Sequence, residues 1–239
     1  MIRHRSPHLI CLLLLYLCAA ATACRAEPSP STTLPEFSQA NWKELGVVPV
    51  EEQKETASGF VIGGKNDTAL IRKLTSINGR TIAELEKDMR PDAKSEVSSK
   101  KGFLGNYEKL LEILAGDNQY VVEELQLSHQ IIARHLLALG AIGVKQSEKP
   151  FRYEGVQYKV TMYPARGYQL SPFYDDTKTN MAVAVENLDA ETKLTYSLLV
   201  PQMIERYGFY EGTGTPYRLD PKQALKVLTF LKPVVKKSP

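Results

Sequence analysis

His129 and the adjacent pair Asp175 and Asp176 are the residues in this sequence whose types best suit acid–base catalysis. A histidine titrates near neutral pH and can act as a general base, and a nearby carboxylate can share in the proton transfer. His129 falls just inside the predicted start of a helix, where the positive end of the helix dipole disfavours the charged imidazolium. The two aspartates lie in a polar loop between predicted strands. A hydrolase site built from these residues is therefore one hypothesis, and a surface histidine with a solvated loop is its alternative.

Metal and nucleotide sites lack the residue spacing that they need. His129 and His135 are six positions apart, which separates them by about 240° around a helix, so one helix face cannot present both to a metal ion. The segment from Gly59 to Lys65 has the glycine and lysine spacing of a phosphate-binding loop, but Asn66 follows where that motif requires Ser or Thr. We therefore expect neither a metal ion nor a cofactor.

A second candidate site is an aromatic recognition surface in the C-terminal part of the chain. Tyrosines and phenylalanines concentrate between residues 151 and 217, with arginines and glycines among them. Tyr and Arg are favoured at recognition surfaces, because they combine a large contact area with a polar group. Both sugars and peptides suit such a surface, although aromatic residues of strands also fill sheet cores. The residues expected to bind a ligand are Arg166, Tyr168, Arg206, Phe209, Tyr210 and Arg218.

Composition and charge narrow the class of protein. The chain has 239 residues, of which 43% are hydrophobic and 24% are charged, a composition typical of a globular protein with a substantial core. The formal charge of +3 comes from Arg3, Arg5 and Arg25, and the rest of the chain is neutral. A nucleic-acid partner is not expected, because the sequence has no basic excess and no nucleic-acid-binding motif.

Residues 1–26 have the layout of a secretory signal peptide: a basic start, the apolar run from Leu9 to Leu17, and small residues after it. The segment Ala21-Thr22-Ala23 before Cys24 resembles the lipobox of bacterial lipoproteins, which implies lipidation of Cys24 and attachment to a membrane through that lipid anchor only. Cleavage before Glu27 is the alternative.

The cysteines agree with an exported protein that has no disulfide bonds. All three lie within the first 24 residues, so none remains for a disulfide bond or a cysteine nucleophile in the rest of the chain. Residues 27–40 are polar and rich in Pro, Ser and Thr, which predicts a flexible tether. We expect the protein to be periplasmic or attached to the cell envelope.

The remaining chain, 41–239, is predicted to form a single α+β domain. A helical lobe is expected over about 41–145 and a sheet lobe over about 146–239, with an antiparallel sheet and terminal helices. The lobes are expected to pack together.

Local signals support these elements. Thr81 and Glu84 form a capping-box pattern, which predicts a helix start. Helical spacing around Leu110 predicts a helix that ends at Gly116, and Ser128 is expected to cap another that ends at Gly140. Apolar and polar residues alternate over 156–162, 181–185 and 194–198, which predicts strands. Pro201 and Asp220 mark the starts of the terminal helices.

Two functions from different classes follow. The first is a non-catalytic binding module in a bacterial cell envelope, which recognises a wall polysaccharide or an envelope protein through the aromatic surface. The second is an exported hydrolase that uses His129 with Asp175 or Asp176. A structural subunit of a larger assembly is a third hypothesis.

Overall fold

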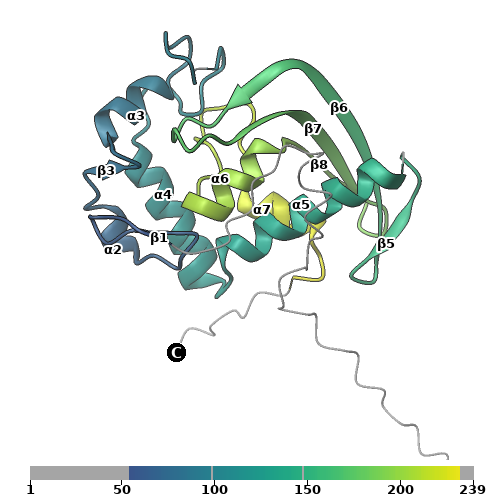
Figure 1. Cartoon of the computed structure of the whole chain (residues 1–239). Coiled ribbons are helices and arrows are strands. Elements are labelled where there is room, and N and C mark those ends of the chain that lie inside the picture. The colour runs from purple at the N-terminus through teal and green to yellow at the C-terminus, as the bar shows by residue number, and fades with distance from the viewer. Residues whose placement is uncertain (1–53, 98, 147, 232–239) are drawn as a thin grey trace, which may run out of the picture.

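The computed structural model describes residues 54–97, 99–146 and 148–231 (Figure 1). The predicted signal peptide, Cys24 and the predicted tether lie outside the described residues. Helices and antiparallel sheets occur together, which confirms the α+β class.

A four-stranded antiparallel sheet forms the frame of the C-terminal part. Its order is β5–β6–β7–β8, with the bounds β5 (Phe151–Tyr153), β6 (Val156–Leu170), β7 (Lys178–Asn187) and β8 (Thr192–Ser197). The strands predicted from the alternation of apolar and polar residues are confirmed. The apolar residues of these strands that are buried on the core side are Tyr158, Val160, Val183, Val185 and Tyr196. In Figure 1, β6 and β7 curve as a long arch, and α5 contacts β6 beneath it.

The β6–β7 ladder is interrupted by a bulge. Pro164 pairs with Met181 and Gln169 pairs with Thr179, so residues 165–168 of β6 lie opposite Asn180 alone. Bulges of this kind bend a strand and redirect its side chains, and they are common beside functional sites. β6 is therefore longer than the predicted strand, and its exposed end is shaped by the bulge.

The described N-terminal part contains short elements. Their bounds are β1 (Lys54–Glu55), β2 (Val61–Ile62), α2 (Thr68–Ile71), β3 (Ser76–Ile77), β4 (Arg80–Thr81) and α3 (Ile82–Asp88). The capping box at the start of α3 is confirmed, because Thr81 Oγ1 accepts a hydrogen bond from Glu84 N and the Glu84 carboxylate accepts one from Thr81 N. Asn78 and Gly79, both with positive φ, form the turn between β3 and β4.

Three further helical elements form the middle of the chain: α4 (Leu110–Asn118), the π-helix η1 (Gln119–Glu124) and α5 (His129–Gln146). The predicted end at Gly116 is wrong, since α4 continues into η1. Ser128 does cap α5, because its Oγ accepts a hydrogen bond from Ile131 N.

The predicted end of α5 at Gly140 is also wrong. A Cβ atom at Gly140 would lie 3.1 Å from Leu198, and one at Gly143 would lie 2.4 Å from Val160. These glycines let α5 approach the sheet and its connection to α6 closely, so they serve packing rather than helix termination.

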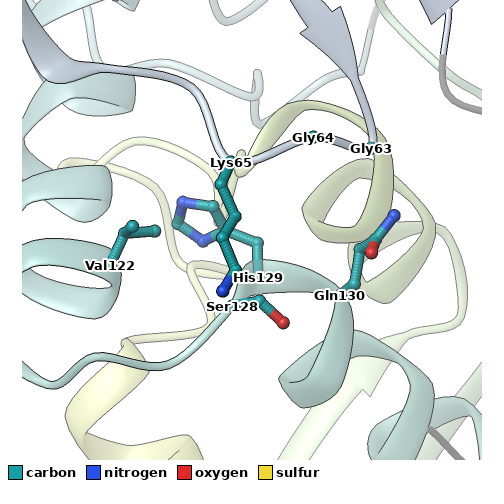
Figure 2. A pocket seen from close by; sticks show the side chains of 7 residues that line it. All are labelled: Gly63, Gly64, Lys65, Val122, Ser128, His129 and Gln130. Carbon is teal, nitrogen blue, oxygen red and sulfur yellow. The ribbon is translucent and has the colours of Figure 1, made fainter.

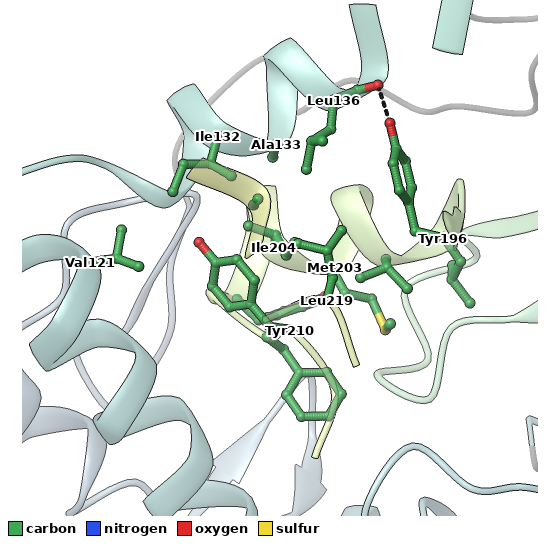
Figure 3. Packing of buried hydrophobic residues seen from close by; sticks show 14 of the residues in the cluster. Val121, Ile132, Ala133, Leu136, Tyr196, Met203, Ile204, Tyr210 and Leu219 are labelled. Carbon is green, nitrogen blue, oxygen red and sulfur yellow. Dashed lines mark hydrogen bonds between the residues drawn. The ribbon is translucent and has the colours of Figure 1, made fainter. Parts of the chain in front are cut away.

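Two helices close the described chain: α6 (Leu199–Tyr207) and α7 (Pro221–Val227). Gly208 ends α6 with a φ of 67°, and the Asp220 side chain caps α7 by accepting a hydrogen bond from Lys222 N at 2.7 Å. Figure 3 shows α5 and α6 meeting in the core, where the Tyr196 hydroxyl donates a hydrogen bond to the Leu136 carbonyl.

Within the described residues, no single helix combines the length and apolarity that crossing a membrane requires. Among the described helices, the pair Leu110–Glu124 and His129–Gln146 alone reaches that length and composition together, and it is bent by 96°. Such composition is also found in buried core helices.

Candidate functional site

His129 is buried, and both of its ring nitrogens have protein partners. Nδ1 lies 3.0 Å from the Tyr210 hydroxyl, and Nε2 lies 3.2 Å from Asn118 Oδ1. Because Oδ1 of an amide only accepts, we assign the proton to Nε2, and Nδ1 then accepts a hydrogen bond from Tyr210. Burial lowers the pKa of His129 to about 4. His129 is thus a neutral ring held between two side chains, with no nitrogen directed to a substrate.

The aspartates of the predicted hydrolase site have a different set of partners. Asp175 Oδ2 accepts a hydrogen bond from the Tyr207 hydroxyl at 2.9 Å and lies 3.7 Å from Nε of Arg206. Asp176 is exposed and has a positive φ of 59°. The structure therefore gives His129 and Asp175 separate contacts and does not bring them together as a catalytic pair.

A cavity of about 300 Å³ lies at the start of α5 (Figure 2). The glycine–lysine segment Gly63-Gly64-Lys65 lines it together with Val122, Ser128, His129 and Gln130. The Ser128 hydroxyl caps α5, and the His129 ring bonds Tyr210. Across the described residues, no group of three or more His, Cys, Asp or Glu side chains has an arrangement that could hold a metal ion.

A larger groove, of about 450 Å³, lies where the β6–β7 bulge faces the loop after α6. Its volume falls in the range of small-molecule sites, about 300–1,000 Å³. Two tyrosines at its walls are strongly exposed, Tyr168 by 62% and Tyr217 by 52%. Arg166, Gln169, Asn180 and Ser197 are among the polar residues that line it. The groove therefore combines aromatic rings with hydrogen-bonding side chains.

Neighbouring side chains hold the walls of this groove in place. The Ser197 hydroxyl of β8 donates a hydrogen bond to Gln169 Oε1 of β6 at 3.1 Å. Lys178 Nζ lies 5.2 Å from the centre of the Tyr168 ring, within the range of a cation–π contact. The sheet thus positions Tyr168 beside Arg166, as two of the residues predicted from the sequence.

The other residues predicted to bind a ligand lie elsewhere. Phe209 and Tyr210 are both 0% exposed and belong to the core, where the ring of Phe209 packs edge-on against Phe173. Arg206 is buried beside Asp175. These three side chains therefore do not form an open recognition surface.

Arg218 is half-buried and pairs with Asp117 through both of its terminal nitrogens, at 3.1 and 2.5 Å. This pair joins α4 to the loop before α7. Asp117 lies inside α4, and its carboxylate faces Arg218.

Glu211 lines the groove and was not predicted. Its side chain is 1% exposed, its backbone has a positive φ of 65°, and burial raises the pKa of its carboxyl to about 8. Strained backbone and buried acids concentrate at functional sites. The only signal in the sequence is a glutamate between an aromatic pair and a glycine, which many surface loops share.

No protein-family model matches this chain, and the searches of curated proteins and of solved structures found no significant match. The candidate site is therefore defined by its own geometry.

Proposed function

We propose that this protein is a non-catalytic binding module of a bacterial cell envelope and that it binds a wall polysaccharide in the groove between the β6–β7 bulge and Tyr217. The observation that carries the proposal is the pairing of two exposed tyrosine rings with neutral polar side chains along one groove. A sugar has apolar ring faces that stack on aromatic rings and hydroxyls that bond amides and hydroxyls.

The groove has few charged lining residues and several neutral polar ones, which suits a glycan. Of its lining residues, Arg166 is the one base and Glu211 the one acid. Glu211 is neutral at pH 7, because burial raises the pKa of its carboxyl to about 8. Gln169, Asn180 and Ser197 supply uncharged donors and acceptors.

The proposed location and organisation follow from the N-terminal sequence and the order of the elements. We propose export by residues 1–26, attachment through lipid on Cys24, and a tether over 27–40. The helical lobe, about 41–145, and the sheet lobe, about 146–239, are proposed to form one domain.

Co-sedimentation with purified wall polymer tests this function. We expect the full-length protein, kept in solution with detergent, to pellet with the polymer and to release no soluble fragments. Tyr168→Ala and Tyr217→Ala should each weaken binding about threefold to tenfold, as expected for the loss of a stacking ring.

Tyr107→Ala is the matched control. Tyr107 is 96% exposed and does not line the groove, so its loss should leave binding unchanged. Equal effects of all three substitutions, or none, would show that the groove is not the site. Binding to an envelope protein without binding to the polymer would favour a protein partner, and release of fragments would favour the hydrolase.

A further inference from the structure

In the part of the chain that the structure describes, no lysine or arginine forms an ion pair with the buried carboxyl group of Glu211. Arg218 lies near enough for its charge to oppose the rise in the pKa of the Glu211 carboxyl, but its guanidinium is directed to Asp117 and donates to the backbone carbonyl of Glu211. Among the described residues, the hydrogen-bond partner of the Glu211 carboxyl is the Thr215 hydroxyl, 3.1 Å from Oε2. Buried carboxylates in proteins are normally paired with a cation. The groove beside Glu211 is therefore where a missing positive group fits.

We propose that the groove binds the primary ammonium group of an amino sugar, with Glu211 as its counter-ion and Tyr168 and Tyr217 beside it. This inference rests on the proposed function, because the wall glycan supplies the sugar.

The aromatic walls suit an ammonium group. Lys178 Nζ already lies over one face of the Tyr168 ring at 5.2 Å, and since the residue is 62% exposed, we expect a ligand at the other face. Tyr217 is six positions after Glu211 in the same loop and lines the same groove. Aromatic rings combined with a carboxylate are a common way to bind an ammonium ion.

The loop that carries Glu211 is fixed in place. Gly212 N donates a hydrogen bond to the Phe103 carbonyl at 2.8 Å, and Leu219 N donates one to the Tyr210 carbonyl at 3.0 Å. These bonds hold the positive φ of Glu211, so little ordering is needed when a ligand arrives.

The charges around Glu211 place the ammonium group at one end of the groove. Arg218 and Asp117 neutralise each other, and Glu108 is used by Gly214 N at 2.9 Å, further along the loop. Arg166 lines the groove and Lys178 lies over the Tyr168 ring, and each repels a cation near its own side chain. The ammonium group is thus expected at the Glu211 end.

Binding of a cation has a consequence that a neutral ligand does not share. Free Glu211 is protonated below about pH 8, because burial raises the pKa of its carboxyl. An adjacent ammonium favours the carboxylate and so lowers that pKa. Binding below pH 8 therefore releases a proton from Glu211 to the buffer, and the apparent affinity rises with pH by up to about tenfold per pH unit.

Calorimetry with two matched tetrasaccharides tests the inference. The full-length protein in detergent is titrated at about pH 6 with the glucosamine tetramer and with the N-acetylglucosamine tetramer, in two buffers of different ionisation enthalpy. We expect the glucosamine tetramer to bind at least tenfold more tightly and to release about one proton. Glu211→Gln should abolish both the preference and the proton release.

Glu124→Gln is the control, because Glu124 is exposed and does not line the groove; it should behave as the wild type. Equal binding of the two tetramers, or preference without proton release, would overturn the role of Glu211 and leave the glycan-binding groove standing. If neither tetramer nor wall polymer binds, the proposed function itself fails. A circular dichroism spectrum equal to that of the wild type shows that Glu211→Gln folds.

Discussion

Gly143→Ala should destabilise the protein, although alanine is normally the better helix residue. Gly143 lies inside α5, and a Cβ atom there would be 2.4 Å from Cγ1 and 2.5 Å from Cβ of Val160 on β6. Val160 is 0% exposed and branches at Cβ, so it cannot swing aside. The helix or the strand must move instead.

The expected size combines two opposing effects. Overpacking of a tight core costs about 1–3 kcal/mol, and a clash with a branched Cβ on a strand belongs at the upper end. Replacing glycine by alanine in a helix returns about 1 kcal/mol. We therefore expect a net loss of about 2 kcal/mol in the free energy of unfolding, or about 4–8 °C in Tm for a chain of this size.

Urea unfolding followed by circular dichroism measures this change, and Gly116→Ala provides the matched control. Gly116 also lies in a helix, α4, but no atom lies within 4 Å of a Cβ built there. The same substitution should therefore stabilise the protein by about 1 kcal/mol at this position. If Gly143→Ala stabilised the protein as well, α5 would not approach β6 as closely as we describe.

Three further predictions concern buried charges. Burial lowers the pKa of both His129 and His135 to about 4, so these histidines take up protons at a higher pH in the unfolded chain than in the folded protein. The free energy of unfolding should therefore fall by about 3 kcal/mol per histidine as the pH drops from 6.5 to 4. A free energy of unfolding that does not change with pH would contradict their burial as neutral rings. The effect of pH on Glu211 has the opposite sign, because the stability that its protonated carboxyl contributes below pH 4.5 is lost as the pH rises through its pKa of about 8. In the same assay, Glu211→Gln should therefore be more stable than the wild type by up to about 5 kcal/mol above pH 8. Asp117→Asn should cost about 3–5 kcal/mol by leaving the Arg218 cation unpaired, and a smaller effect in urea unfolding would mean that solvent reaches it.

Elements with strong local signals could be predicted from the sequence. The capping box at Thr81 and the Ser128 cap depend on neighbouring residues, and the structure has both. The strands could be predicted as well, because the burial of one sheet face repeats at every second residue along the chain.

Helix ends at glycines were the local feature that could not be predicted. A glycine ends a helix when its φ is positive, as at Gly208, but Gly140 and Gly143 remain in helical conformation because another part of the chain packs against them. Whether a glycine ends a helix or allows another segment to pack closely against it therefore depends on residues far away in the sequence.

For the candidate site, the sequence alone determined the residue types: a region rich in tyrosine and arginine, with Arg166 and Tyr168 among its members. Only the tertiary structure decided which of them share a groove and which, like Phe209 and Tyr210, fill the core. It also decided that Glu211 is a buried acid with no ion pair among the described residues. The physical reason is that burial and charge pairing depend on contacts between distant segments, such as Arg218 with Asp117, whereas composition and spacing describe only neighbours along the chain.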